Sequence, residues 1–461
     1  MRTPAQTNKV RRFIHRAYWR SGSLNFYVSK RVRPAGVAVM SLAPLAFILM
    51  PRISQTPVFQ LRGMILGALA CSFAWSLTRR CKISAKRILP AAASAGEPLI
   101  YYVEITNLSK HKVRQVLINE TEHDDRPTLD QFSLGREPGE ESRNAFDQYF
   151  AYYRWLWLRR KNQKYTPAAN HQKIQLAGHE TKKFPLSITP LKRGVIQLDK
   201  IDLCLPDPLG LFQKCRRIKT EPQKVIILPK RYRIPALKLP GSARYQLGGE
   251  SASFNSGESG DFTSVRDYRP GDPPRHIHWK SWAKTGKAIV KEYEEIFFPH
   301  YGLILDTCAP PNLLDSFEEA VSVAASFAVS LDSNQSLLDL MFIKDQAHRF
   351  TTGRNEAKVD HILEILAEVE PQAIIDYQVM EKLLHKHLAD LSSCIVVFVG
   401  WDQQKADFLR NLHQANANLL VMAIFPDQQQ AQQQLASVPA ATSIHPVLAD
   451  ETEKSLANIF S

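Results

Sequence analysis

The chain has 461 residues, of which 59 are Lys or Arg and 45 are Asp or Glu, so its formal net charge is +14. A charge of this size is typical of nucleic-acid binding, because Lys and Arg neutralise phosphates. The distribution of the charge excludes that class. Sixteen basic residues and no acid lie in residues 1–96, whereas the remainder of the chain is close to neutral. The excess charge therefore surrounds the apolar N-terminal segments.

Two apolar segments, residues 34–51 and 63–78, follow a basic stretch at residues 1–33. As helices they span about 27 and 24 Å, close to a bilayer core of about 30 Å that flanking arginines help to bridge. The alternative is a buried helical hairpin in a soluble protein. Basic residues cluster before the first segment and after the second, so the positive-inside rule predicts a transmembrane hairpin at 34–78 with both termini cytoplasmic. We therefore expect a multi-pass protein of the cytoplasmic (inner) membrane with most of its chain in the cytoplasm.

The six cysteines are scattered along the chain and include no CxxC pair. This arrangement is not typical of a zinc site or of a disulfide framework. We expect neither, in agreement with a cytoplasmic location.

Residues 79–235 are typical of short strands separated by turns. Expected strands lie at 99–106, 113–118, 183–188, 194–203 and 225–228. Short strands with few helical patterns predict a small β-sandwich.

An insertion at about residues 137–177 interrupts these strands with aromatic residues that precede Arg159, Arg160 and Lys161. Our preferred interpretation is a helix that packs on the sandwich, since aromatic residues on a helix are usually buried. The alternative is an interfacial element that rests on the anionic inner leaflet, where aromatic rings beside cations are favourable.

Residues 299–461 alternate strands and helices. Strands are expected at 302–305, 337–343, 394–399 and 419–425, and helices at 312–331, 357–369, 379–388 and 402–415. This alternation predicts an α/β domain with a parallel, doubly wound sheet. Ligands of such sheets bind at the carboxyl ends of the strands, which is the position of Asp306.

A connector at residues 236–298 contains the densest group of charges. Its acids include Asp261, Asp267 and Asp272, and its cations include Arg266, Arg269 and Arg275, with a turn predicted at Pro270-Gly271. The alternation of His276, His278 and Lys280 with Ile277 and Trp279 predicts a half-buried strand. Because buried charges are costly unless paired, the segment is expected to form a network of ion pairs that joins the two soluble parts.

The residues Arg266-Asp267-Tyr268-Arg269-Pro270-Gly271-Asp272, with Asp261, Arg275 and Trp279, resemble the signature of a bacterial membrane-anchored family, domain-of-unknown-function family fifty-eight. The resemblance covers roughly residues 34–430. It implies a von Willebrand factor A-like fold for 299–461, and it implies a MoxR-type AAA+ ATPase as a partner, but it supplies no known activity. His278 departs from the pattern, because the family usually has Asp there.

In von Willebrand A-like domains the strand end often holds a metal site of the form DxSxS. Here Cys308 and Pro310 replace the two hydroxyl ligands after Asp306, so we expect no metal and no cofactor, with Asp306 as a weak candidate only.

The sequence thus predicts a non-catalytic, membrane-anchored interaction protein that contacts the lipid bilayer and no nucleic acid. The alternative is an enzyme that uses Asp261, Asp267 and Asp272 as acid–base or metal-binding carboxylates. Oligomerisation is compatible with either function.

Overall fold

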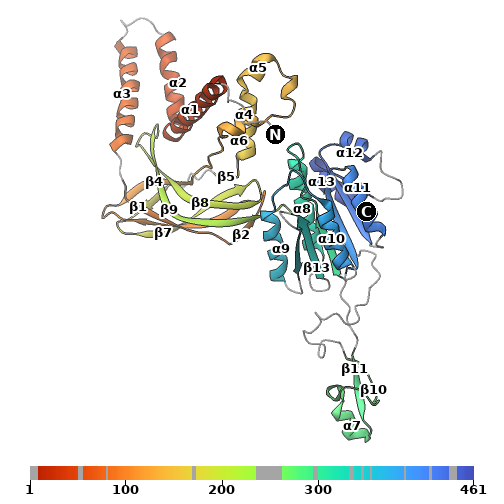
Figure 1. The fold of residues 1–461 in the computed structure, drawn as a ribbon. Helices are drawn as coiled ribbons and strands as arrows, with labels where there is room; N and C mark the ends of the chain where they lie inside the picture. The colour runs from red at the N-terminus through yellow and green to blue at the C-terminus, as the bar shows by residue number, and fades with distance from the viewer. Residues whose placement is uncertain are drawn as a thin grey trace. The chain divides into compact units, whose positions relative to one another are not determined.

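The computed structural model describes residues 9–49, 56–78, 81–168, 173–234, 262–293, 300–331, 337–343, 347–352, 356–388, 391–414, 418–435 and 444–460 (Figure 1). The chain divides into two compact units, Met1–Pro229 and Lys230–Ser461. Each unit has a hydrophobic core of its own, and each is described by itself.

Three helices begin the first unit: α1 (Lys9–Arg31), α2 (Pro34–Leu49) and α3 (Thr56–Thr78). Helix α1 has no acid in its first turn and ends on Lys30 and Arg31, which interact favourably with the helix dipole. Helices α2 and α3 contact each other and lie side by side in Figure 1. Both are built almost entirely from apolar residues, so neither has a polar face.

The expectation of two membrane-spanning helices is wrong. Among the residues that the structure describes, only Gln60–Thr78 of α3 is long and apolar enough to cross a membrane. Helix α2 has 16 residues and contains Pro44. At ~1.5 Å per residue it reaches about 24 Å, short of the ~20 residues that a bilayer core requires. The transmembrane hairpin and the multi-pass topology are therefore not supported, and α3 stands as one candidate span by length and composition.

Two β-sheets enclose the core of the first unit, with strand orders β1-β3-β7-β5 and β2-β9-β8-β4-β6. The strands are β1 (Ile83–Ile88), β2 (Ala92–Ser94), β3 (Leu99–Asn107), β4 (Val113–Glu120), β5 (Tyr165–Pro167), β6 (Ile174–Leu176), β7 (Thr181–Pro190), β8 (Gly194–Pro206) and β9 (Gln213–Leu228). Strand β3 shows why this sequence forms a sheet. Its residues Leu99, Tyr101, Val103 and Ile105 point into the core, while the residues between them face outward.

Strands β8 and β9 form a long antiparallel hairpin, and in its register Cys204 lies opposite Cys215. These two cysteines form a disulfide, so the expectation of no disulfide is wrong. No local pattern indicates the bond, because the cysteines are 11 residues apart and only the strand register brings them together. Cys71, Cys81, Cys308 and Cys394 form no disulfide.

The insertion between β4 and β5 forms a helical layer rather than one helix. It comprises α4 (Leu129–Leu134), a 3-10 turn (Glu140–Ser142), α5 (Ala145–Phe150) and α6 (Tyr152–Asn162). A second small core holds this layer to α1, and its buried members are Ile14, Phe132, Ala151, Trp155 and Leu158. The insertion therefore packs against α1 through a core separate from that of the sheets.

The second unit contains a six-stranded sheet of order β14-β13-β12-β15-β16-β17. Its strands are β12 (His300–Leu305), β13 (Leu337–Ile343), β14 (Ala347–Thr352), β15 (Ser393–Val399), β16 (Leu419–Phe425) and β17 (Ile444–Leu448). The sheet is mixed, because β14 pairs antiparallel with β13, so the prediction of a purely parallel sheet is corrected. Counted along the chain, the order is 3-2-1-4-5-6, which has a switch point between β12 and β15.

Helices cover both faces of this sheet (Figure 1). They are α8 (Leu314–Ser330), α9 (Glu356–Glu368), α10 (Tyr377–His387), α11 (Gln403–Gln414), α12 (Gln428–Leu435) and α13 (Thr452–Phe460). One face packs on α8, whose Phe317, Val321 and Ala324 are buried, and the other packs on α10 and α11. Because both faces are covered, the central strand β15 is buried at every position, and it is apolar after its first residue, Ser393.

Candidate functional site

The charged connector forms a short hairpin with a helix at its tip. Strand β10 (Phe262–Asp267) pairs antiparallel with β11 (Ile289–Tyr293), and between them lie a 3-10 turn (Pro274–His276) and α7 (Trp279–Thr285). The expected strand through His276, His278 and Lys280 is therefore wrong. The backbone N–H of His278 pairs with the carbonyl of Ile289, after which the chain turns into helix α7. Gly286 ends that helix with a φ of 67°.

One ion pair holds the turn of this hairpin. The guanidinium of Arg266 donates to both oxygens of Asp272, at 2.7 and 2.8 Å, which is the bidentate geometry that Arg favours. The backbone N–H of Arg269 donates to the same carboxylate at 2.8 Å. Gly271 supplies the φ of 109° that the turn needs. Hydrogen bonds from Arg266 and Arg269 lower the pKa of Asp272 to about 2.

The other predicted residues of this segment take different places. Asp267 ends β10, and its backbone carbonyl accepts a hydrogen bond from Arg266 at 3.2 Å. Arg275 lies in the 3-10 turn. Asp261 lies outside the described residues. The structure thus brings Arg266, Asp267 and Asp272 together.

Aromatic side chains are exposed beside this turn. Trp279 and Trp282 are one helical turn apart on α7 and stack at 5.3 Å between ring centroids, with 17° between the ring planes. Their side chains are 63% and 37% exposed, and Tyr268 is also exposed. A stacked indole pair in contact with water is costly for a monomer, and it is typical of a surface that binds another molecule.

A second cluster lies at the switch point of the sheet. Asp306 follows β12 and is buried, and its backbone N–H pairs with Val397 of β15. Oxygen Oδ1 accepts from the N–H of Cys308 at 2.8 Å and from the hydroxyl of Tyr377 at 3.0 Å. Oxygen Oδ2 accepts from the N–H of Val399 at 3.1 Å and lies 2.9 Å from Nζ of Lys405. Four donors thus occupy the roughly four lone-pair sites of the carboxylate.

Lys405 supplies the positive charge of this cluster from inside the protein. Its side chain is 3% exposed, and its ammonium also donates to the carbonyl of Val399. Lys405 lies in the first turn of α11. The side chain of Asp402 caps the N-terminal end of this helix by accepting a hydrogen bond from the backbone N–H of Lys405. A buried carboxylate that already has a buried ammonium partner has little to gain from a divalent cation.

The side chains around Asp306 are mostly apolar and closely packed. The adjoining cavity measures about 10 Å³, and its lining includes Ile304, Phe398 and Phe408. Burial and the nearby Asp306 raise the pKa of Tyr377 well above its usual range, so this phenol stays protonated and donates. The same two causes, burial first, raise the pKa of the Cys308 thiol. Neither group is poised as a nucleophile or a base at neutral pH.

Both clusters lie in a part of the chain that matches a known protein family. The family described as Protein of unknown function DUF58 matches residues 264–442. Residues 264–442 are a DUF58 domain. The matched range contains the Arg266–Asp272 turn, the stacked tryptophans and the Asp306–Lys405 cluster, so all of these features belong to the DUF58 part of the chain.

Relatives add little about function. The uncharacterized protein YeaD of Bacillus subtilis (strain 168) is 27% identical over 189 residues, which is 41% of this chain and 45% of that protein. The chain thus matches less than half the length of this relative. Among solved structures, the CARDB domain of a Pyrococcus furiosus protein is 9% identical, with a TM-score of 0.15 over 30% of this chain and 88% of that one. A PapD-like domain of human CEP192 is 11% identical, with a TM-score of 0.17 over 32% and 90%.

Two residues of the Asp306–Lys405 cluster, Lys405 and Tyr377, were not predicted from the sequence. A signal for Lys405 was present. It lies three, four and seven residues before the buried Phe408, Leu409 and Leu412, so it occupies the apolar face of an amphipathic helix. A lysine on such a face requires a buried partner. Tyr377 offered no such signal, because its partner lies 71 residues away.

Proposed function

We propose that this protein is a non-catalytic, membrane-associated interaction protein whose DUF58 domain recruits a MoxR-type AAA+ ATPase. The observation that carries the proposal is the exposed stack of Trp279 and Trp282 beside a turn fixed by the Arg266–Asp272 pair. Tryptophan, tyrosine and arginine dominate the energetically important residues of protein interfaces. A preformed turn also lowers the entropic cost of binding.

We further propose that the second unit is of the von Willebrand A type. Support comes from its strand order and from Asp306 at the switch point, where domains of this type bind a metal. In this chain the ammonium of Lys405 takes the place of that cation beside Asp306. Partner binding by the domain would therefore require no metal bridge.

One carboxylate of the competing enzyme hypothesis, that of Asp272, is engaged in structural bonds. Both oxygens of Asp272 accept from Arg266, and the depressed pKa of Asp272 leaves it a weak base at neutral pH. The carboxylate of Asp306 is also engaged, since it pairs with Lys405 through one oxygen and accepts hydrogen bonds at both. These contacts favour a role in shape and binding over a role in catalysis.

Replacing the tryptophan pair tests the proposed interaction. Trp279→Ala combined with Trp282→Ala is expected to weaken binding of the full chain to the MoxR-type ATPase of the same organism at least ~30-fold, as loss of a hot spot of about 2 kcal/mol would. The melting temperature should change little, because Trp279 is 63% exposed and no residue of α7 is buried. Binding is measured by surface plasmon resonance in detergent.

The matched control is Ile374→Ala, which removes an apolar side chain that is 89% exposed elsewhere in the same unit. It should leave ATPase binding intact. Unchanged affinity of the double tryptophan variant would rule out this surface as the docking site. Loss of cellular function in Asp272→Asn with normal ATPase binding would instead support the enzyme hypothesis.

We also propose that the two soluble units lie in the cytoplasm. Helix α1 contacts β9, and its Lys30 pairs with Asp202, so α1 and the sheets lie on the same side of any bilayer. A complete crossing by α3 alone would separate α1 from the sheets, so α3 is proposed to insert into the bilayer from the side of the soluble units. The segment before α2 holds nine basic residues and no acid, and such segments stay on the cytoplasmic side. The Cys204–Cys215 disulfide weighs against this location, because disulfides persist mainly in oxidising compartments.

Reporter fusions at residue 461 distinguish the two sides. Green fluorescent protein fused there is expected to fluoresce, and alkaline phosphatase fused there is expected to stay inactive, because each folds on one side only. A fusion of each reporter to a known cytoplasmic protein calibrates the signals. Active phosphatase would place the soluble units in the oxidising compartment that the disulfide favours.

A further inference from the structure

The helical insertion of the first unit exposes a group of aromatic rings, here called the aromatic surface. Its members come from α5 and the start of α6: Phe146, Tyr149, Phe150, Tyr152 and Tyr153. The rings lie against one another, with centroids 4.6 Å apart for Phe146 and Phe150 and 5.2 Å apart for Tyr149 and Phe150. Phe146 is 69% exposed. So many exposed rings in one patch are unusual for a surface that faces only water.

This surface is rigid, because its other side is anchored in a core. Ala151 joins α5 to α6 with a φ of 51° and is itself buried with Trp155. Arg154 pairs with Glu140, and both side chains are largely buried. Tyr18 of α1 donates to the carbonyl of Phe150. The small core is therefore already filled. Tyr152 contacts Tyr18 at its edge, at 5.7 Å between ring centroids, and the exposed rings are not among its buried members.

Cations lie on the elements that carry and adjoin the aromatic surface, although Asp147 of α5 and the exposed Glu141 lie there as well. The guanidinium of Arg143 lies 4.1 Å from the centroid of the Tyr153 ring, and α6 ends on Arg159, Arg160 and Lys161. The adjoining helix α1 contributes Arg12, Arg16 and Arg20, which are exposed at a spacing of four residues on one face. This half of the unit thus combines aromatic rings with positive charge.

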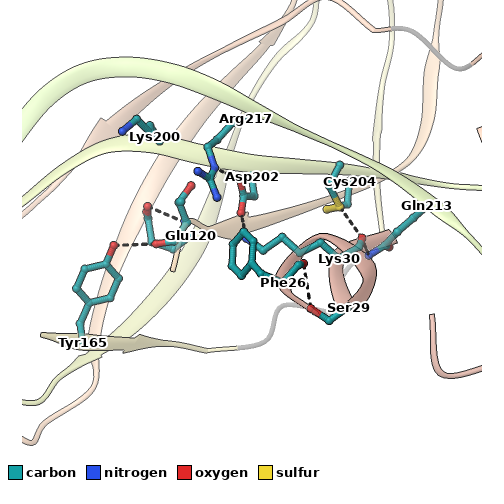
Figure 2. Close-up of polar contacts among 12 residues, drawn as sticks. Phe26, Ser29, Lys30, Glu120, Tyr165, Lys200, Asp202, Cys204, Gln213 and Arg217 are labelled. Atoms are coloured by element: carbon teal, nitrogen blue, oxygen red, sulfur yellow. Dashed lines mark hydrogen bonds and ion pairs between the residues drawn. A yellow bond between two sulfur atoms is a disulfide. The ribbon is translucent and has the colours of Figure 1, made fainter. Parts of the chain in front are cut away.

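Helix α1 links the aromatic surface to the apolar helices. At its N-terminal half it packs on α4 and the small core. At its C-terminal end, Lys30 lies between the ring of Phe26 and the carboxylate of Asp202, and Arg217 pairs with the same Asp202 (Figure 2).

The chain then passes directly into α2. At this point Val32 forms a β-bridge with Phe212, and the N–H of Arg33 donates to the carbonyl of Leu211. Helix α3 returns to the same place, where Phe73 contacts the ring of Phe212 and Lys214 donates to the carbonyl of Leu77. Figure 1 shows α5, α1, α2 and α3 together on the side of the β8–β9 hairpin. The aromatic surface and the candidate membrane helix therefore belong to one face of this unit.

From this arrangement we propose that the aromatic surface rests on the interface of a bilayer that contains anionic phospholipid. Amphipathic aromatic rings settle at the headgroup level, and arginines beside them bind the lipid phosphates. The absence of acids from α1 avoids repulsion from an anionic leaflet. The inference rests on the membrane association proposed above and adds a second contact with the bilayer, made by the insertion.

Photo-crosslinking from single sites tests the proposal in the full chain. The photoreactive residue p-benzoylphenylalanine replaces Phe146, and the protein is reconstituted in nanodiscs of phosphatidylcholine with phosphatidylglycerol. Position 146 is expected to crosslink phospholipid several-fold more than position 102. Tyr102 is similarly exposed but lies on β3, in the sheet β1-β3-β7-β5, whereas α1 and α3 contact β9 of the other sheet. Replacing phosphatidylglycerol by phosphatidylcholine, or changing Arg12, Arg16 and Arg20 to Gln, should reduce lipid crosslinking at 146.

Crosslinking from Leu66, an exposed position of α3, separates this proposal from the underlying membrane association. If position 66 forms lipid adducts but position 146 forms no more than position 102, the aromatic-surface proposal alone is overturned. No lipid adducts at either position would overturn both. In native membranes, a crosslink from 146 to a protein instead of lipid would also overturn the proposal and would identify the surface as a protein-binding site.

Discussion

Arg87→Ala is expected to lower the free energy of unfolding by about 3–5 kcal/mol, because it leaves a buried carboxylate without its partner. The guanidinium of Arg87 donates to Glu120 at 2.7 and 3.1 Å, and the two side chains are 0% and 1% exposed. Tyr101 donates to the same carboxylate. Burial and Glu120 raise the pKa of Tyr101, so the phenol stays protonated in this network. The melting temperature of the full chain in detergent should fall by on the order of 10 °C.

Arg136→Ala provides the matched control. Arg136 pairs with Glu141 at 3.2 Å, but both side chains are almost fully exposed, so its loss should change stability by less than about 1 kcal/mol. The double variant Arg87→Met with Glu120→Leu should recover most of the lost stability, because it removes both buried charges. A melting temperature for Arg87→Ala equal to that of Arg136→Ala would show that the buried network does not stabilise the sheets.

Lys405→Ala is expected to have an effect of similar size, about 3–5 kcal/mol, on the second unit. The variant leaves Asp306, whose side chain is 1% exposed, without the ammonium that lies 2.9 Å away. Arg410→Ala on the same helix is the control, since Arg410 and Asp407 form an exposed pair. The double variant Lys405→Met with Asp306→Asn should recover part of the stability that Lys405→Ala loses. Calorimetry of the full chain measures the stability of each variant.

The same measurement tests the interpretation of Lys405 as an internal cation. Millimolar Mg²⁺ should not change the melting temperature of the unmodified protein, because the carboxylate of Asp306 is already neutralised. Micromolar binding of Mg²⁺ that disappears in Asp306→Asn would contradict this interpretation. It would instead indicate that the lysine gives way to a metal ion.

Local patterns predicted the secondary structure where one side of an element faces the core. Strand β3 alternates buried and exposed residues along its whole length, and helix α11 has a regular apolar face, so both were evident from the sequence. Strands β14 and β17 were missed, since they lie at the two edges of the sheet and have few buried positions.

Features that depend on distant residues were harder to predict. The alternation of polar and apolar residues around Trp279 suggested a strand. Instead, His276 and His278 precede a short helix, α7, whose two tryptophans stack on each other. The bond between Cys204 and Cys215 depends on a register set by the whole β8–β9 hairpin. The pairing of Arg266 with Asp272 could have been predicted from the sequence, because only five residues, among them a Pro-Gly turn, lie between them.

Strand β9 has a mechanical consequence for the first unit. It has 16 residues, so it extends about 50 Å at ~3.3 Å per residue. One end contacts α1 and α3, and the other pairs with β2 immediately before the second unit begins. A pull on residue 228 would load the β8–β9 hydrogen bonds in shear, where many bonds share the force. Tension at the DUF58 side would thus pass along strand β9 to the end that contacts α1 and α3, where the Cys204–Cys215 bond crosslinks the two strands of the hairpin.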